Sequence, residues 1–398
     1  MAHDAEDLSF LFFAPTRIVY GVNSAADVAV ELRNLGCDKA VIVTDQSLYD
    51  NTDLVKKIEK TLGTMCVGVY SDVPSDSGLH VVNRGYAFAR DLGATGVVSV
   101  GGGSVIDTAK GIAILLKEGG QLEDYQGFRT LTRKVAAHVC LPTTAGTGSE
   151  VTHIAVIKDS DKRQKLVLGD HHIIPDVAIL DPVLTAGLPP GLTAATGMDA
   201  LSHAVEAITS SQREPITDAL GLHAIRLIGE WLPLAVKNGG DLSARGHMLV
   251  AATLAGAAFS NAQAGLAHAI AHTVGARHGV HHGLAKAVAM PYVMRFNNSH
   301  VAAEQAAIAE ALGVDTRDME VEQAGLAAAD AVARLSTGLG LPATLKDVGV
   351  PGNDLEACAQ VALSDGAITY NGKPVFDASQ VLSVLSNAWT GDSTPRSR

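Results

Sequence analysis

Residues 96–119 have the sequence GVVSVGGGSVIDTAKGIAILLKEG, and this stretch decides the fold. A β-rich run ends in three glycines, and a segment with helical spacing of apolar residues follows at once. Further β-rich runs lie at 39–45, 64–73, 177–184 and, entering a Gly/Thr loop, 138–150. Strands that alternate with helical patterns predict a parallel sheet with βαβ crossovers.

The character of the chain changes after Leu188-Pro189-Pro190, where strand signals nearly vanish. Long Ala/Leu-rich amphipathic patterns follow at 191–209, 215–236, 243–260, 263–276, 284–295, 301–312, 321–338, 354–363 and 378–389. The sequence therefore predicts an α/β domain with a parallel sheet over 1–188 and an all-helical domain over 189–398.

Composition excludes several classes of protein. The formal charge of -12 disfavours a nucleic-acid or anionic-membrane partner, although backbone amides can still bind phosphate locally. The four cysteines are widely spaced and form no CxxC motif, which indicates reduced thiols. No signal-peptide pattern and no apolar stretch of membrane-spanning length is present. We expect a cytoplasmic enzyme.

The glycine turn has two interpretations. Gly102, Gly103 and Ser104 lie between a strand and a helix, where glycine lets a pyrophosphate approach the helix N-terminus. The spacing is not GxGxxG, and a strand–helix turn needs glycine in any case. Asp107, in the first turn of that helix, suits the helix dipole or a hydrogen bond to a ribose or amide.

Two more segments suit a nucleotide. Asp45 ends the strand VIVTD, where a carboxylate binds a ribose 2′-hydroxyl or caps the next helix. The loop that contains Thr143, Thr144 and Thr147 offers hydroxyls and amides for a ribose or a carboxamide. Loop polarity alone explains the same composition.

Ligand-type side chains occur in two groups. Asp199 and His203 stand at i, i+4, which places them on one helix face. His268 and His272 repeat this spacing, and His282 follows. One carboxylate and several imidazoles suit iron or zinc. Spacing of i, i+4 also serves surface hydrogen bonds, but histidines within an apolar run need partners.

Together these segments resemble the iron-containing, or group III, alcohol dehydrogenase family, which has the dehydroquinate synthase-like fold. The matching segments are VIVTD (41–45), GGGSVIDTAK (101–110), LPTTAGTGSEVT (141–152), KLVLGDHHIIPDVAILDP (165–182), TGMDALSHAVEA (196–207), AFSNAQAGLAHAIAHTVGA (258–276) and HGLAKAVAMP (282–291). The resemblance implies an NAD-binding α/β domain, an all-helical metal-binding domain, and an active site in the cleft between them. It also implies at least a dimer.

The resemblance assigns roles to individual residues. The implied metal ligands are Asp199, His203, His268 and His282. His272 corresponds to a histidine near the nicotinamide and the proton path, and Phe259 to a wall of the substrate pocket. The implied NAD(H) contacts are Asp45, Ser75, Gly102, Gly103, Ser104, Asp107, Thr143, Thr144, Thr147 and Lys165.

Some positions depart from the family pattern. His281 replaces a common proline and competes with His282 as the last ligand; the HG dipeptide favours His282. Lys286 stands where asparagine is common, and Ser75 where asparagine often contacts the cofactor. His153 lies near the implied pocket. These departures leave the chemistry intact and the substrate open.

The sequence thus predicts a metal-dependent oxidoreductase, with Fe²⁺ or Zn²⁺, that transfers a hydride between a small alcohol and NAD⁺ to give an aldehyde or ketone. A hydroxyacid–oxoacid transhydrogenase or a maleylacetate-reductase-like enzyme are alternatives on the same fold. A metal- and nucleotide-binding regulator is the non-enzyme alternative. We expect no nucleic-acid or membrane partner and a homodimer or larger homo-oligomer.

Overall fold

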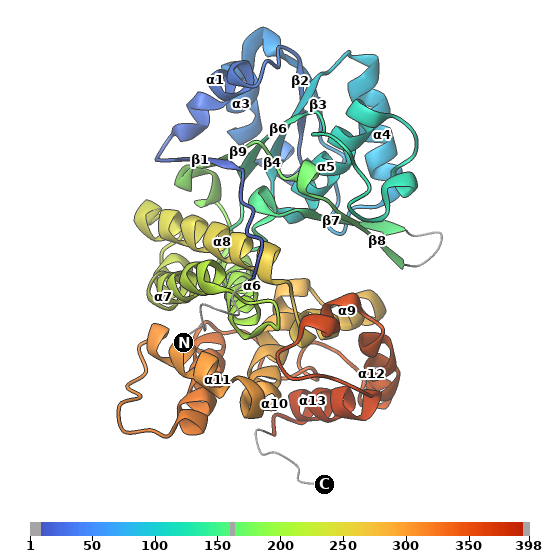
Figure 1. Ribbon diagram of the computed structural model, residues 1–398. Helices are drawn as coiled ribbons and strands as arrows, with labels where there is room; N and C mark the ends of the chain where they lie inside the picture. Colours follow the sequence, from blue (N-terminus) through green and yellow to red (C-terminus); the bar gives the residue numbers. More distant parts are fainter. Residues whose placement is uncertain (1–8, 160–163, 393–398) are drawn as a thin grey trace. The chain divides into compact units, whose positions relative to one another are not determined.

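The structure is a computed structural model that describes residues 9–159 and 164–392 (Figure 1). The chain divides into two compact units. One unit is Phe13–Leu188, and the other contains residues 189–392 together with 9–12. The α/β class of the first unit and the helical class of the second are as the sequence predicts.

Phe13–Leu188 is built on a six-stranded sheet in which every paired strand is parallel. In spatial order the strands are β1 (Arg17–Tyr20), β9 (Val177–Leu180), β6 (Ala137–Pro142), β4 (Gly96–Gly101), β2 (Ala40–Val43) and β3 (Cys66–Tyr70). Because the strands are parallel, the turns that follow β2, β3, β4 and β6 lie at one edge of the sheet, where ligands bind in such folds.

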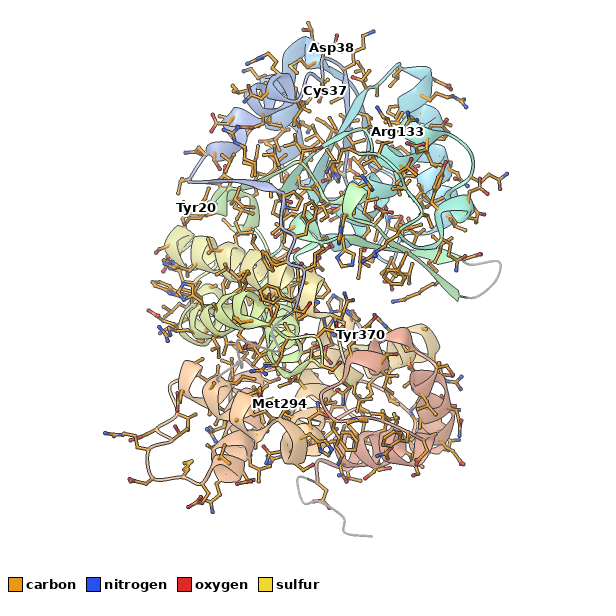
Figure 2. All side chains as sticks on the ribbon, viewed as in Figure 1. Tyr20, Cys37, Asp38, Arg133, Met294 and Tyr370 are labelled. Carbon is orange, nitrogen blue, oxygen red and sulfur yellow. The ribbon has the colours of Figure 1, made fainter. Side chains whose placement is uncertain are left out.

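Both faces of this sheet are buried, as parallel sheets require. Alternate residues of β2 enter different cores: Val41 and Val43 pack in one, and Ala40 and Ile42 in the other. Helices α4 (Leu79–Asp91) and α5 (Gly103–Glu118) contribute to the first core, and α1 (Val28–Asn34) and α3 (Leu54–Leu62) to the second (Figure 1). The free thiol of Cys37 lies buried in this second core (Figure 2).

A small second sheet was not expected from the sequence. Strands β7 (Ile154–Asp159) and β8 (Gln164–Gly169) are antiparallel, and β5 (Gly127–Phe128) pairs with β8. Ala155 and Ile157 of β7 join the core beside α5, while the alternate residues Ile154, Val156 and Lys158 are less buried. This one-sided burial produces a short alternating pattern rather than a continuous apolar run.

The helical unit contains eight long or medium helices among its described residues. They are α6 (Pro190–Thr209), α7 (Pro215–Lys237), α8 (Leu242–Ala262), α9 (Leu266–His278), α10 (His282–Ala311), α11 (Val321–Gly338), α12 (Leu355–Leu363) and α13 (Ala378–Thr390). The two helices expected at 284–295 and 301–312 form the single element α10. It is kinked at Val301, whose φ and ψ are -133° and 33°.

Small residues bring these helices close together. A Cβ at Gly197 of α6 would lie 2.3 Å from Leu232 Cδ1 of α7, and one at Gly283 of α10 would lie 2.4 Å from the Ala195 carbonyl oxygen of α6. The α6–α10 approach sets the distance between the two groups of predicted ligands.

Among the described helices, α7 has the length and apolar composition of a membrane span, and α8 with α9 qualifies only as a pair bent by 103°. Core helices pass the same test.

Candidate active site

Helix α6 presents three functional groups on one buried face. Asp199, His203 and Glu206 are spaced i, i+4 and i+7, and all three side chains are buried. Glu206 was not singled out by the sequence analysis. Its spacing from Asp199 is two helical turns, so the face that carries the predicted ligands was the signal that could have found it.

Glu206 orients His268, which comes from α9. Its carboxylate accepts a hydrogen bond from His268 Nδ1 and another from the Ala267 amide at 2.8 Å. Burial alone would raise the pKa of Glu206, but His268, the charge of Lys286 and the Ala267 hydrogen bond together lower that pKa overall. Because Nδ1 is the donor, the Nε2 lone pair of His268 faces away from Glu206 and is free for a cation.

The remaining predicted ligand lies beside this pair. The His282 ring is 5.7 Å from the His268 ring and stacks at 5.3 Å on the His272 ring. His281 is exposed and forms the N-cap of α10. The contacts with the other imidazoles therefore favour His282 over His281 as a site residue.

Lys286 lies among three of the four predicted ligands. Its Nζ donates to His203 Nε2 at 3.0 Å and to His268 Nε2 at 2.9 Å, and it forms an ion pair with Asp199 Oδ1. The Lys286 side chain is fully buried. Lys286 stands one turn after His282 on α10, so the close approach of α10 to α6 brings its ammonium to the Asp199 carboxylate.

The donor set fits a divalent transition metal. One buried carboxylate and inward-facing imidazole nitrogens are the ligands that iron and zinc accept, and a carboxylate behind a ligating imidazole is typical of such sites. The same donor atoms already face a cation of this chain, the Lys286 ammonium. A metal ion that binds all four predicted ligands must therefore displace that ammonium.

Another group of ligand-type atoms occurs in the helical unit. Among the described residues, His278, Asp354 and Cys358 have three such atoms within 4.8 Å of one another. The Arg277 guanidinium contacts both Asp354 oxygens, at 2.8 and 2.6 Å. Since this carboxylate is already neutralised, we interpret the group as an ion-pair cluster that fastens α9 to α12.

His272 has a carboxylate partner that no sequence pattern indicated. Its Nδ1 hydrogen-bonds Asp365 Oδ2 at 2.8 Å, across 93 positions of the chain. Burial would raise the pKa of Asp365, but the hydrogen bond and charge of His272, with the Ala367 hydrogen bond and the charge of His268, lower it overall. Phe259 stacks on His203 with ring centroids 4.3 Å apart, so it forms an apolar wall against the predicted metal site.

In Phe13–Leu188, the glycine turn and the threonine loop lie against each other. A Cβ at Gly102 would lie 3.2 Å from Thr144 Oγ1, and one at Gly103 would lie 2.6 Å from Thr147 Cγ2. The Thr143 amide donates to the Gly101 carbonyl at 3.1 Å. No side chain caps the N-terminus of α5, so its first amides remain available to a phosphate.

The turn after β3 reaches the same place. The amide of Asp76, next to Ser75, donates to Ser104 Oγ at 3.2 Å. Three turns from different strands therefore surround the start of α5: the turn at 75–76, the glycine turn and the threonine loop. This arrangement suits the pyrophosphate and ribose of a dinucleotide.

Asp107 is bound to the protein itself. Its Oδ2 accepts from the Val156 amide at 3.0 Å, and burial raises its pKa despite the nearby charge of Lys110. Lys110, one turn after Asp107 on α5, was not predicted as a site residue; it is fully buried and donates to the carbonyls of Thr152 and Ile154 at 2.9 and 2.7 Å. Lys165 is exposed at the start of β8, and its charge acts on Asp107.

Asp45 follows β2 and caps α2 (Gln46–Asn51), because its Oδ1 accepts from the Leu48 amide at 2.8 Å. Asp45 therefore acts as a helix cap through Oδ1, as one of the two sequence interpretations expects. A carboxylate has further acceptor positions, so the cap leaves room for a ribose hydroxyl.

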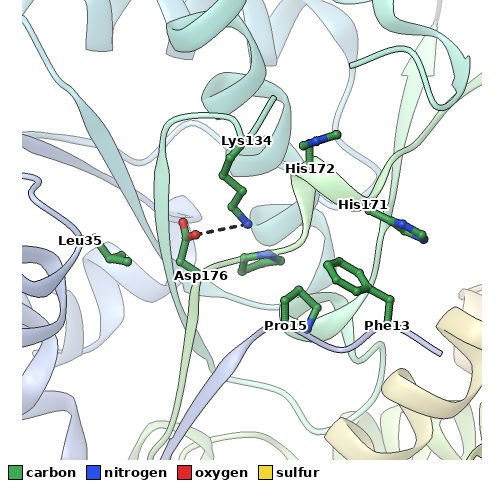
Figure 3. Close-up of a pocket in the computed structure, with 8 residues that line it drawn as sticks. Phe13, Pro15, Leu35, Lys134, His171, His172 and Asp176 are labelled. Carbon is green, nitrogen blue, oxygen red and sulfur yellow. Dashed lines mark ion pairs between the residues drawn. The ribbon is translucent and has the colours of Figure 1, made fainter. Parts of the chain in front are cut away.

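His153 is buried in Phe13–Leu188, and burial followed by the charge of His171 lowers its pKa to about 4. The two rings meet edge to face at 5.5 Å. Figure 3 shows His171 at a surface pocket whose charged pair, Lys134 and Asp176, is 3.2 Å apart. The pocket is lined by Phe13, Pro15, Leu35, Lys134, His171, His172, Pro175 and Asp176. None of these was a predicted site residue.

Comparison with known proteins gives concordant results. Residues 15–182 match the family described as iron-containing alcohol dehydrogenase, and residues 193–389 match the Fe-containing alcohol dehydrogenase family, C-terminal. The chain is 38% identical to the NAD-dependent methanol dehydrogenase of Bacillus methanolicus over 379 residues, covering 95% of this chain and 99% of that protein.

Solved structures agree. A crystal structure of 1,3-propanediol oxidoreductase superposes with a TM-score of 0.93 at 36% identity and covers 96% of this chain and 100% of that one. A maleylacetate reductase from Agrobacterium tumefaciens gives a TM-score of 0.82 at 27% identity, over 96% and 99% of the two chains.

Proposed function

The chain belongs to the iron-containing alcohol dehydrogenase family, and we propose that it transfers a hydride between a small alcohol and NAD⁺, giving an aldehyde or ketone, and catalyses the reverse reduction. The observation that carries this proposal is the buried cluster of Asp199, His203 and His268, with Glu206 behind the last of these. Membership of the family makes the chain an oxidoreductase.

The metal-holding residues in this proposal are Asp199, His203, His268 and His282. When bound, a divalent metal lowers the pKa of an oxygen ligand such as an alcohol, and NAD⁺ accepts the hydride. The chain's own contribution is to hold three imidazoles and one carboxylate close together, with Asp199, His203 and His268 buried from water. Imidazole and carboxylate donors suit Fe²⁺ and Zn²⁺ alike.

The NAD(H) site uses the turns around the start of α5. We assign the pyrophosphate to the amides near Gly102, Gly103 and Ser104, and the adenosine ribose to Asp45, which would repel a 2′-phosphate. The other proposed contacts are Ser75, Asp107, Thr143, Thr144, Thr147 and Lys165. The existing hydrogen bond of Asp107 to β7 makes it a positioning residue within this set.

His272 is the proposed proton carrier. An imidazole titrates near neutrality, and the hydrogen bond to Asp365 fixes its Nδ1 as the donor, so Nε2 can accept a proton released from the alcohol. Phe259 and His153 are the proposed substrate-contacting residues. We further propose a cytoplasmic location and a homodimer or larger homo-oligomer.

The test is NADH absorbance with purified protein of known metal content and a panel of primary alcohols and diols. We expect NADH to form with at least one alcohol, and to be consumed with the matching aldehyde. Binding of NAD⁺ without turnover in either direction would contradict the proposal.

The likeness to a maleylacetate reductase supports one second candidate, reduction of an unsaturated oxo-dicarboxylic acid. A panel of such acids separates the two functions.

A further inference from the structure

We propose that Lys286 is a tethered competitor for the metal position. Its ammonium holds the ligand atoms in place when no metal is bound, and it must withdraw before a divalent ion can bind. This inference rests on the metal-binding part of the proposed function and goes beyond it, because it makes metal binding an exchange of one cation for another.

The contacts of Lys286 match those expected of a metal. An ammonium group carries three N–H donors, and here three acceptors surround it: His203 Nε2 at 3.0 Å, His268 Nε2 at 2.9 Å and the paired Asp199 carboxylate. These are the same atoms that the proposed metal site uses. Two cations cannot share a position that close to the same three atoms, so binding of one excludes the other.

The neighbourhood also favours a positive charge at this point. Asp199 and Glu206 are two buried carboxylates, and the Nδ1 proton of His268 is directed at Glu206. Removing water from carboxylates is costly unless an opposite charge lies nearby. Lys286 supplies that charge from within the chain, whereas a neutral residue at this position would leave the metal as the main counter-ion.

The backbone allows an exchange without unfolding. Lys286 lies on α10 one turn from His282, and Gly283 fixes the approach of this helix to α6. The long methylene stem of lysine has several rotatable bonds, so Nζ can move while the helix stays in place. Binding of a metal is then expected to be weakened by the free energy needed to displace the ammonium.

The experiment measures Co²⁺ binding to chelator-stripped protein, followed through the visible absorption of bound Co²⁺, without NAD or substrate. The proteins are the wild type, Lys286→Met, Lys286→Asn and Lys286→Arg. Arg295→Met is the matched control, because Arg295 lies on the same helix and pairs with Asp330 outside the cluster. We expect Met and Asn to tighten Co²⁺ binding by about 10- to 100-fold, the range seen for groups that contact metal ligands. Arg and the control should not tighten it.

Thermal unfolding gives a second readout. We expect the metal-free Met variant to unfold at a lower temperature than the metal-free wild type, and Co²⁺ to restore its Tm more than it raises that of the wild type. Should the Met variant not fold, the Asn variant provides both measurements. Equal Co²⁺ affinity in wild type and both neutral variants would overturn the inference, as would binding by none of them. Tightened Co²⁺ binding without any alcohol turnover would contradict the proposed function alone.

Discussion

Replacing Glu206 with glutamine tests whether this carboxylate keeps His268 ready to bind a metal. Glutamine has the same size and retains one carbonyl oxygen, which can still accept from the Ala267 amide. Its amide nitrogen, however, replaces the oxygen that now accepts from His268 Nδ1. Two donors would then face each other, and the imidazole would relieve this only by moving its proton to Nε2, the atom that faces Lys286.

The expected size of the effect follows from that single lost contact. A hydrogen bond to a charged group contributes about 1.5–3 kcal/mol, which corresponds to roughly 10- to 150-fold in an equilibrium constant. We therefore expect Glu206→Gln to weaken metal binding by about 10- to 100-fold, in line with other carboxylates that support ligating histidines.

The assay is a Co²⁺ titration in competition with a chelator, in the wild-type and in the Lys286→Met background, so that displacement of the ammonium is absent from the second comparison. Glu310→Gln is the matched control, because Glu310 is exposed on α10 and its carboxylate accepts a hydrogen bond from Thr316, far along α10 from the ligand residues. A Glu206→Gln protein that folds normally and binds Co²⁺ within twofold of its parent in both backgrounds would refute the reasoning.

Four further predictions concern single residues. His282→Ala should lose more bound metal than His281→Ala in elemental analysis; the reverse order would make His281 the ligand. Asp45→Gly should raise the ratio of NADP(H) to NAD(H) efficiency on the order of tenfold, the value of one hydrogen bond, while an unchanged ratio would leave Asp45 a cap only. His272→Ala should keep its metal and lose about 10²- to 10⁴-fold in turnover, with the pH–rate profile altered; loss of metal would make it a ligand. Burial lowers the pKa of His138 from 6.5 to about 3. Between these pH values the unfolded chain binds a proton at His138 that the folded protein does not bind, so the free energy of unfolding falls as the pH drops. His138→Gln should flatten the pH dependence of urea unfolding between these values, where the wild type loses up to roughly 4 kcal/mol.

The sequence predicts the central strands well because they are buried on both faces. The runs at 39–45 and 96–103 contain β2 and β4, whose residues are all buried. The run at 64–73 contains β3, an edge strand that is mostly half-buried. The sequence does not predict β1, which has four residues at the other edge of the sheet and is largely exposed. Such a strand has little burial to shape its sequence, and its pairing with β9 joins segments about 160 positions apart.

In the candidate site too, residues close in sequence could be grouped from the sequence, whereas contacts between distant segments could not. Helical spacing alone groups Asp199 with His203 and His268 with His272. It could also have included Glu206, which shares their face. Asp365 could not be found this way, because its contact with His272 depends on how the segment after α12 returns to α9.

The role of Lys286 depends entirely on tertiary packing and cannot be read from residue spacing. In the sequence it is a single lysine in an apolar helix, one turn beyond a histidine. Only the close approach of α10 to α6 turns it into the counter-ion of Asp199. Burial would raise the pKa of that carboxyl, but the charge and hydrogen bond of Lys286, together with the charges of His203 and His268, lower the pKa overall. A site with two buried carboxylates needs a cation in every state of the protein, with or without metal. The chain supplies one itself, and for that reason we expect the metal-free site to remain folded and ordered rather than to collapse or take up water.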